Sequence, residues 1–151
     1  PDIELEAVRD RLRARDRAFR ERAQQHVQAY LDEIDGMIRR ARSGEARLSP
    51  SDLASLIETC RAEEAEFKRD LDKARASLRK LRDVVGRSAS EYTTLVAEAE
   101  QVVAQAVGRY IAAFQETRWQ LAALEFELFP ADDPAEVKTS EELRRLLSDN
   151  G

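Results

Sequence analysis

The sequence predicts an all-α fold: an elongated, antiparallel three-helix bundle of coiled-coil type, running up-down-up, with a short C-terminal helix folded back on one end. Apolar residues recur every three or four positions through three segments of about forty residues, which is the spacing of helices packed side by side. Charged residues make up 36% of the chain, with five Gly and four Pro, as is typical of coiled coils. Short breaks separate the segments, so neighbouring helices should run antiparallel.

The first segment, about residues 3–42, carries one apolar stripe whose members lie three, four or seven residues apart. Gly44 is the predicted C-terminal cap of this helix. Ser49 or Ser51, together with Pro50, is predicted to start the next helix, because a Ser oxygen caps free N–H groups and proline sets the first helical φ. The stripe consists of Leu5, Val8, Leu12, Phe19, Ala23, Tyr30, Ile34, Met37 and Ala41.

The second and third segments, about residues 51–85 and 89–129, repeat in the same way. In the second segment only Glu64 breaks the apolar rule, and the third segment stops before Pro130. The second stripe consists of Leu53, Ile57, Cys60, Glu64, Phe67, Leu71, Ala74, Leu78, Leu81 and Val85. The third stripe consists of Tyr92, Leu95, Ala99, Val102, Ala106, Tyr110, Ala113, Thr117, Leu121, Leu124 and Leu128.

Residues 1–129 are thus predicted to form the bundle, and residues 130–151 a polar linker with a short helix at about 140–148. Close to the end of the third segment, a second apolar stripe of Trp119, Ala123 and Phe126 lies opposite Leu121. Either the tail helix covers this stripe as a partial fourth helix, or the stripe is an oligomer interface. The candidate protein interface is Trp119, Phe126, Leu143 and Leu147, at an end that should also hold Leu31, Ile38, Leu48 and Leu56.

Glu64 is a carboxylate on a core stripe, and it needs partners because an unpaired buried charge is costly. Aligning the antiparallel helices by their turns places it level with His26 and Tyr30 in the first segment and with Arg109 and Tyr110 in the third. We expect these five residues to form a buried polar layer that fixes helix register. A small-molecule or ion site, or a Glu64 that reaches solvent, are the alternatives.

The sequence offers little for catalysis. Cys60 is the only cysteine and His26 the only histidine, so one chain can form neither an internal disulfide nor a Cys/His zinc site. The glycines are scattered and do not form a phosphate-binding loop. We therefore expect no enzyme activity, no catalytic or metal-binding residues, no cofactor and no small-molecule substrate, and we expect Cys60 to be a small core residue.

Charge is unevenly distributed along the chain. The net charge of -5 argues against a dedicated nucleic-acid-binding protein. Arginines and lysines nevertheless gather in residues 9–22 and 68–87, which should be neighbours in the bundle and make one half of it basic. Pairing with acids on adjacent helices would instead make this an ordinary solvated surface. The candidate anion-binding patch is Arg13, Arg17, Arg20, Arg75, Arg79 and Arg82.

These patterns favour a non-enzymatic helical interaction or assembly module, such as an adaptor, spacer or scaffold domain. Its expected partner is another protein or a second copy of the chain, with a dimer favoured over higher oligomers. Binding of an anionic surface, either lipid or the nucleic-acid backbone, is the alternative, and a small-ligand site around Glu64, Tyr30 and Tyr110 ranks last. The sequence has no signal peptide or membrane-spanning run, so the expected location is the cytoplasm. The start at Pro1 is compatible with a fragment of a longer protein.

Overall fold

The structure is a computed structural model that describes residues 2–85, 90–130, 144–145 and 148. The described chain forms three helical rods and is all-α, as predicted. The first rod comprises α1, η1 and α2, the second is α3, and the third comprises α4, η2 and α5, where η1 and η2 are π-helical. Their bounds are α1 Asp2–Arg22, η1 Ala23–Gln28, α2 Ala29–Ser43, α3 Pro50–Val85, α4 Ser90–Ala106, η2 Val107–Ile111 and α5 Ala112–Leu128.

The break between the first two rods uses the predicted residues. Gly44 ends α2 in the left-handed conformation with φ of 83°, which glycine adopts without the steric penalty of a Cβ. Ser49 is the cap of α3: its Oγ accepts the Asp52 N–H at 3.0 Å, while Asp52 Oδ2 accepts the Ser49 N–H at 2.8 Å. This reciprocal pair satisfies two backbone donors before Pro50 begins the helix.

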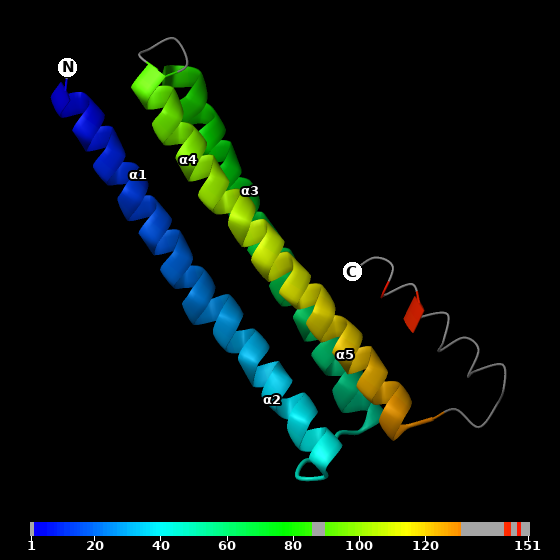
Figure 1. Cartoon of the computed structure of the whole chain (residues 1–151). Helices are drawn as coiled ribbons and strands as arrows, with labels where there is room; N and C mark the ends of the chain where they lie inside the picture. Colours follow the sequence, from blue (N-terminus) through cyan, green and yellow to red (C-terminus); the bar gives the residue numbers. More distant parts are fainter. Residues whose placement is uncertain (1, 86–89, 131–143, 146–147, 149–151) are drawn as a thin grey trace.

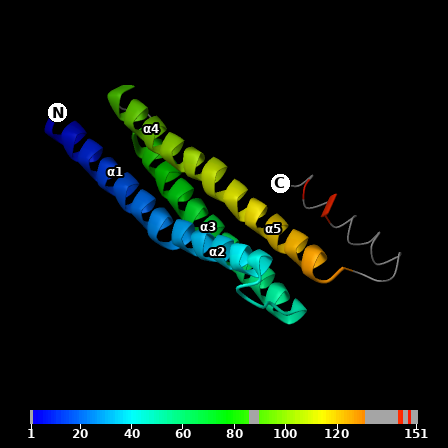
Figure 2. The same ribbon diagram turned by 60° about the horizontal axis from the view of Figure 1, so that its bottom comes forward.

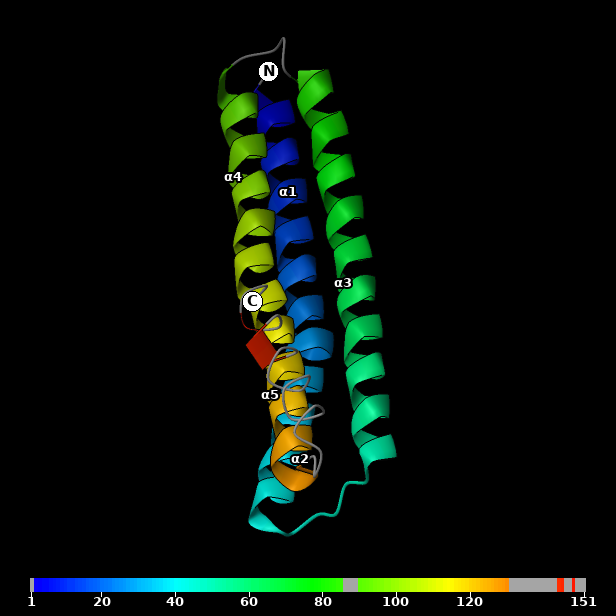
Figure 3. The same cartoon turned by 90° about the vertical axis from the view of Figure 1, so that its right-hand side faces the viewer.

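The rods lie alongside one another in the up-down-up order (Figure 1), and the side view shows α3 running the length of the bundle (Figure 3). The third rod packs against both of the others, because α4 packs against α1 and α3 while α5 packs against α2 and α3. In Figure 2, α3 is seen between the rod of α1 and α2 and the rod of α4 and α5. At the end that holds α2, Arg42 joins the first rod to the third through Glu127 Oε2 at 3.1 Å. Grooves lined by side chains from α1, η1 and α3 separate the first and second rods.

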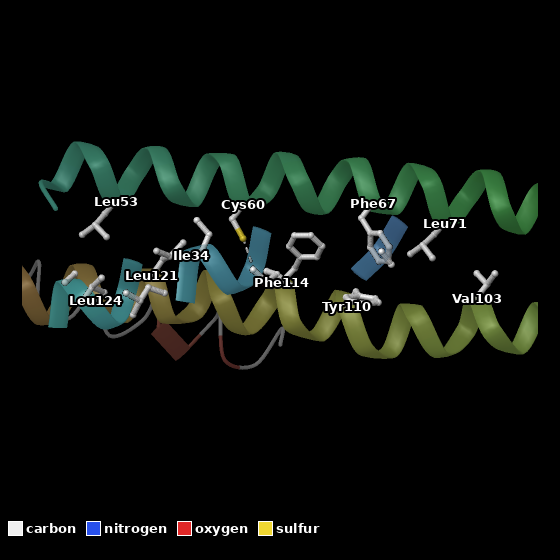
Figure 4. Close-up of a cluster of buried hydrophobic side chains, with 14 of the residues drawn as sticks. Ile34, Leu53, Cys60, Phe67, Leu71, Val103, Tyr110, Phe114, Leu121 and Leu124 are labelled. Atoms are coloured by element: carbon white, nitrogen blue, oxygen red, sulfur yellow. Dashed lines mark hydrogen bonds between the residues drawn. The ribbon is translucent and has the colours of Figure 1, made fainter. Parts of the chain in front are cut away.

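The core follows the predicted stripe most closely along α3. Leu53, Cys60, Phe67 and Leu71 are buried and point toward the third rod (Figure 4). A strict seven-residue repeat keeps one face of an α-helix turned toward its neighbour, so the periodicity of α3 was enough to find its buried face. Glu64 is buried in the same stripe.

In the other two rods the buried stripe shifts at the π-helical turns, and the predicted stripes are partly wrong. Tyr30 and Met37 are half-buried while Leu31 and Ile38 are buried in the core. In the third rod the fully buried residue is Phe114 instead of Ala113. A π turn holds more residues than an α turn, so it changes which residues beyond it face the core. On α4, which precedes η2, Val103 is buried and the predicted Val102 is half-buried, so there the difference from the predicted stripe begins before the π turn.

Candidate functional site

The α5 helix has apolar residues on two opposite sides. Leu121 and Leu124 are fully buried against the other rods. Trp119, Ala123 and Phe126 lie on the other side of the helix, and we call these three residues the outward face of α5. Ala123 is only 4% exposed, and both aromatic side chains are half-buried. This face is therefore sheltered from water although it does not point into the bundle.

Arg144 is the described residue that lies over the outward face. Its Cζ is 5.9 Å from the centroid of the Trp119 ring and 5.3 Å from that of the Phe126 ring, which is the range of cation–π attraction. The next residue, Arg145, is exposed, and Arg144, Arg145 and Ser148 are helical. The tail thus returns to the predicted stripe through Arg144, while Leu143 and Leu147 lie outside the described residues.

The buried Glu64 carboxylate has partners other than the predicted ones. Arg118 Nη2 lies 3.1 Å from Glu64 Oε1, and Lys68 Nζ lies 3.7 Å from Oε2. Arg118 is on α5, about two turns beyond Tyr110, and the length of its side chain lets it reach back to this level. The ion pair therefore ties the second rod to the third and neutralises the carboxylate where it is least solvated.

The other members of the predicted polar layer are dispersed, and the layer of five residues is wrong as predicted. His26 is exposed and lines a groove with Glu63 and Glu66. Tyr110 is buried because its ring packs edge-on against Phe67 at 5.6 Å. Phe67 thus occupies the position opposite Tyr110 that the alignment by turns gave to Glu64.

The remaining two members also have separate environments. Arg109 is exposed and lies over the Tyr110 ring at 5.3 Å. The Tyr30 hydroxyl is buried without a hydrogen-bond partner among the described residues. Burial, followed by the nearby Cys60 and Glu63, raises the pKa of Tyr30. This hydroxyl therefore stays protonated, because its buried surroundings do not solvate the charged phenolate form.

Cys60 is a buried thiol facing α5. Its Sγ lies 4.0 Å from the Phe114 carbonyl oxygen (Figure 4), and the side chain is inaccessible to solvent. Burial raises the pKa of Cys60 to about 11, with Arg118 lowering it and Glu64 raising it to a smaller extent. The thiolate is the nucleophilic form, so this environment suits a packed core residue and disfavours covalent chemistry.

The arginines of the predicted anion-binding patch line two grooves or lie exposed on α1. Arg75, Arg79 and Arg82 line a groove between α3 and α4 of about 600 Å³, in which Arg82 Nη1 lies 3.4 Å from Glu100 Oε2. Arg20 lines a different groove, between the first and third rods, beside Arg109. The two basic stretches are neighbours, as predicted: Arg15 Nη2 on α1 donates a hydrogen bond to Ser77 Oγ on α3, and residues of both stretches line one groove. Arg13 and Arg17 are exposed on α1.

Periodicity alone missed two arginines that matter in this region, Arg118 and Arg144. Arg118 follows the core residue Thr117 directly, and a long cation flanking a stripe that contains a carboxylate was an available signal. Arg144 lies among the leucines of the tail, where a cation on the apolar side of a short helix matches two aromatic rings on its neighbour.

The described ranges hold neither a metal-binding cluster nor a membrane-spanning helix. No cluster of three or more His, Cys, Asp or Glu side chains there could hold a metal ion, and no described helix combines the length and the apolar character needed to cross a membrane. Comparison with protein-family models, with curated proteins and with solved structures finds no significant match for this chain. The arrangement of its own residues is therefore the basis for assigning a function.

Proposed function

We propose that the chain is a non-enzymatic helical interaction module, and that the outward face of α5 is the surface through which it binds another protein or a second copy of itself. The observation that carries this proposal is the position of Trp119 and Phe126. Both rings lie away from the bundle core, and Arg144 is the described residue over them. The proposal covers an adaptor, spacer or scaffold domain.

The two sides of α5 make different contacts, and this difference supports the proposed role. The bundle is closed by residues on the other side of the helix, including Phe114 and Leu121, which are fully buried. Trp119 and Phe126 are therefore available for a different contact. Tryptophan and other aromatic residues are enriched at the centres of protein interfaces, because they bury a large area with few rotatable bonds.

Light scattering on a sizing column, from about 1 to 100 μM protein, tests association through this face over the range in which weak dimers form. We expect the mass of the wild-type chain to rise above 17.2 kDa at the upper concentrations. Trp119→Glu should remain at the monomer mass, because a carboxylate would have to be desolvated in the contact. Val84→Glu is the matched control, since Val84 is 77% exposed on α3.

Two results would contradict self-association through the outward face. The first is a constant mass of 17.2 kDa for the wild type and also for Arg144→Ala, which lacks the arginine side chain over Trp119 and Phe126. The second is a concentration-dependent mass that Trp119→Glu leaves unchanged. A wild-type monomer combined with a dimeric Arg144→Ala variant would show that the face associates once it is uncovered.

A second candidate function is binding of an anionic surface through the groove between α3 and α4. The observation in its favour is that Arg75, Arg79 and Arg82 line one groove together. Replacing Arg75 and Arg79 by Glu should then abolish sedimentation with phosphatidylserine vesicles or with duplex DNA, and the binding of the wild type should weaken as salt rises. Sedimentation that is independent of these two residues would argue against this candidate.

A further inference from the structure

We infer that the outward face of α5 is a seat for an arginine-centred helical segment of a partner protein, and that Arg144 is the chain's own occupant of this seat. The inference rests on the proposed function, because the surface is the same, and it adds the chemistry of the partner. It also makes the tail a competitor that the partner displaces.

The geometry of the seat follows from the spacing of the two rings. Trp119 and Phe126 are seven residues apart, and seven residues of α-helix rise about 10.5 Å. The guanidinium carbon lies 5.9 Å from one centroid and 5.3 Å from the other, so a single arginine contacts both rings. Ala123, between them in sequence and only 4% exposed, forms a floor with a short side chain.

The chemistry of the seat favours arginine over other side chains. A guanidinium is planar and weakly hydrated, and it gains from contact with aromatic faces more readily than the strongly hydrated ammonium of lysine. The nearby carboxylate of Glu127 is paired with Arg42 at 3.1 Å. The contacts that the structure gives Arg144 are thus the two aromatic rings, and a partner's arginine placed between apolar residues would make the same contacts.

The covalent connection of Arg144 to the seat predicts competition. A tethered group acts at an effective concentration on the order of millimolar. A tail whose own dissociation constant for the empty seat is about 100 μM should therefore weaken the binding of a partner segment to the wild-type chain roughly tenfold. Removal of the Arg144 side chain should relieve this competition, and removal of the exposed Arg145 side chain should not.

Trp119 provides the measurement, because it is the only tryptophan of the chain. The probe is a synthetic peptide with the sequence of residues 138–151, titrated into three full-length proteins while Trp119 fluorescence is recorded. The proteins are the wild type, Arg144→Ala and Arg145→Ala. Two further peptides carry alanine in place of the arginine at position 144 or at position 145.

We expect the peptide with both arginines to bind Arg144→Ala about ten times more tightly than it binds the wild type or Arg145→Ala. The peptide with alanine at position 144 should bind Arg144→Ala at least five times more weakly than the peptide with alanine at position 145. Circular dichroism of the three proteins should be the same, which separates a vacated seat from a loss of fold.

The inference is overturned if the unmodified peptide fails to bind Arg144→Ala at concentrations up to the millimolar range, or if the two alanine peptides bind equally. Equal binding to all three proteins would likewise remove Arg144 as a competitor. If any of these results occurs while self-association still depends on Trp119, the arginine seat alone is wrong. If self-association and peptide binding are both absent, both the arginine seat and the proposed function are wrong.

Discussion

The two sides of α5 differ in the side chains that they contact. On the inner side Phe114, Leu121 and Leu124 are fully buried among side chains from the other rods. On the outward face Trp119 and Phe126 meet Arg144. Contacts with many apolar neighbours contribute to the free energy of folding of the whole bundle, whereas a contact with one side chain can be exchanged for another. The inner side therefore maintains the fold, and the outward face is the surface that we propose for recognition.

The largest expected difference between the two sides comes from removing one phenyl ring from each. Phe114→Ala should lower the free energy of unfolding by about 3 to 5 kcal/mol, because it leaves a cavity in a closed core. Phe126→Ala should lower it by roughly 1 kcal/mol, because its ring is half-buried and its site can collapse or hydrate. Urea denaturation followed by circular dichroism measures both values, and equal losses would refute the distinction.

A second substitution addresses the ion pair at the border of the inner side. Arg118→Met leaves the buried Glu64 carboxylate with Lys68 at 3.7 Å, and we expect a loss of about 3 kcal/mol in the free energy of unfolding. The double variant Glu64→Leu with Arg118→Met should lie within about 1 kcal/mol of the wild type, because no charge is then buried. A double variant as unstable as the single one would indicate that packing, rather than charge, is lost.

The pH dependence of stability should report Cys60, which faces the inner side. Its pKa is raised from 9.0 to about 11, so the folded state binds the thiol proton more tightly than the unfolded state does. The contribution is fully present below pH 9 and is lost as pH rises toward 11, with a magnitude of about 2 kcal/mol. Cys60→Ala should remove this part of the decline in urea titrations at pH 8 and pH 10.5.

The Tyr30 hydroxyl, whose pKa is also raised, contributes in the same direction, so Tyr30→Phe is the companion variant. A wild-type stability that stays constant up to pH 10.5 would contradict the burial of both groups. The same thiol should react with a disulfide reagent far more slowly in the native protein than in urea, because reaction requires the rods to separate.

The smallest expected effect belongs to the outward face. Arg144→Ala should lower the free energy of unfolding by only about 0.5 to 1 kcal/mol, and Arg145→Ala should leave it unchanged. The sensitive measurement is acrylamide quenching of Trp119 fluorescence, which should increase in Arg144→Ala and stay at the wild-type value in Arg145→Ala. Equal quenching in all three proteins would mean that Arg144 does not shelter the ring.

The extent to which the sequence predicts this molecule differs between the rods. The buried face of α3 follows a strict seven-residue repeat and was predicted correctly, including Glu64. The first and third rods contain runs of apolar residues spaced four apart, Phe19, Ala23, Val27 and Leu31 in one and Ala99, Val103, Val107 and Ile111 in the other. Such spacing exceeds 3.6 residues per turn, and the π turns η1 and η2 accommodate it. Strict α-helical stripes therefore predicted Ala113 and Tyr30 at the core, where the structure has Phe114 and Leu31.

In the candidate site, too, periodicity predicts some residues and misses others. Trp119 and Phe126 follow from helical periodicity, which places them opposite Leu121. The residues that contact charged or aromatic groups, Arg118 and Arg144, depend on where long side chains extend, which periodicity does not contain. The grooves that Arg20 and Arg75 line depend on the rotation of each rod about its axis, which the periodicity of a single helix does not give either.

At the two π turns, the first and third rods can lose a residue without changing which side chains face the core. Inserting or deleting one residue in a regular α-helix rotates everything beyond it by about 100°, which would turn the apolar stripe of α3 away from its neighbours. A π turn is an α-helix that has already absorbed an extra residue, so a single deletion inside η1 or η2 converts it to regular helix and preserves the phase of both halves. Ala23 and Tyr110 line the same groove, which places the two π turns side by side in the first and third rods, and these two rods run parallel. Single-residue length variants of this protein should accordingly be tolerated there in matched pairs.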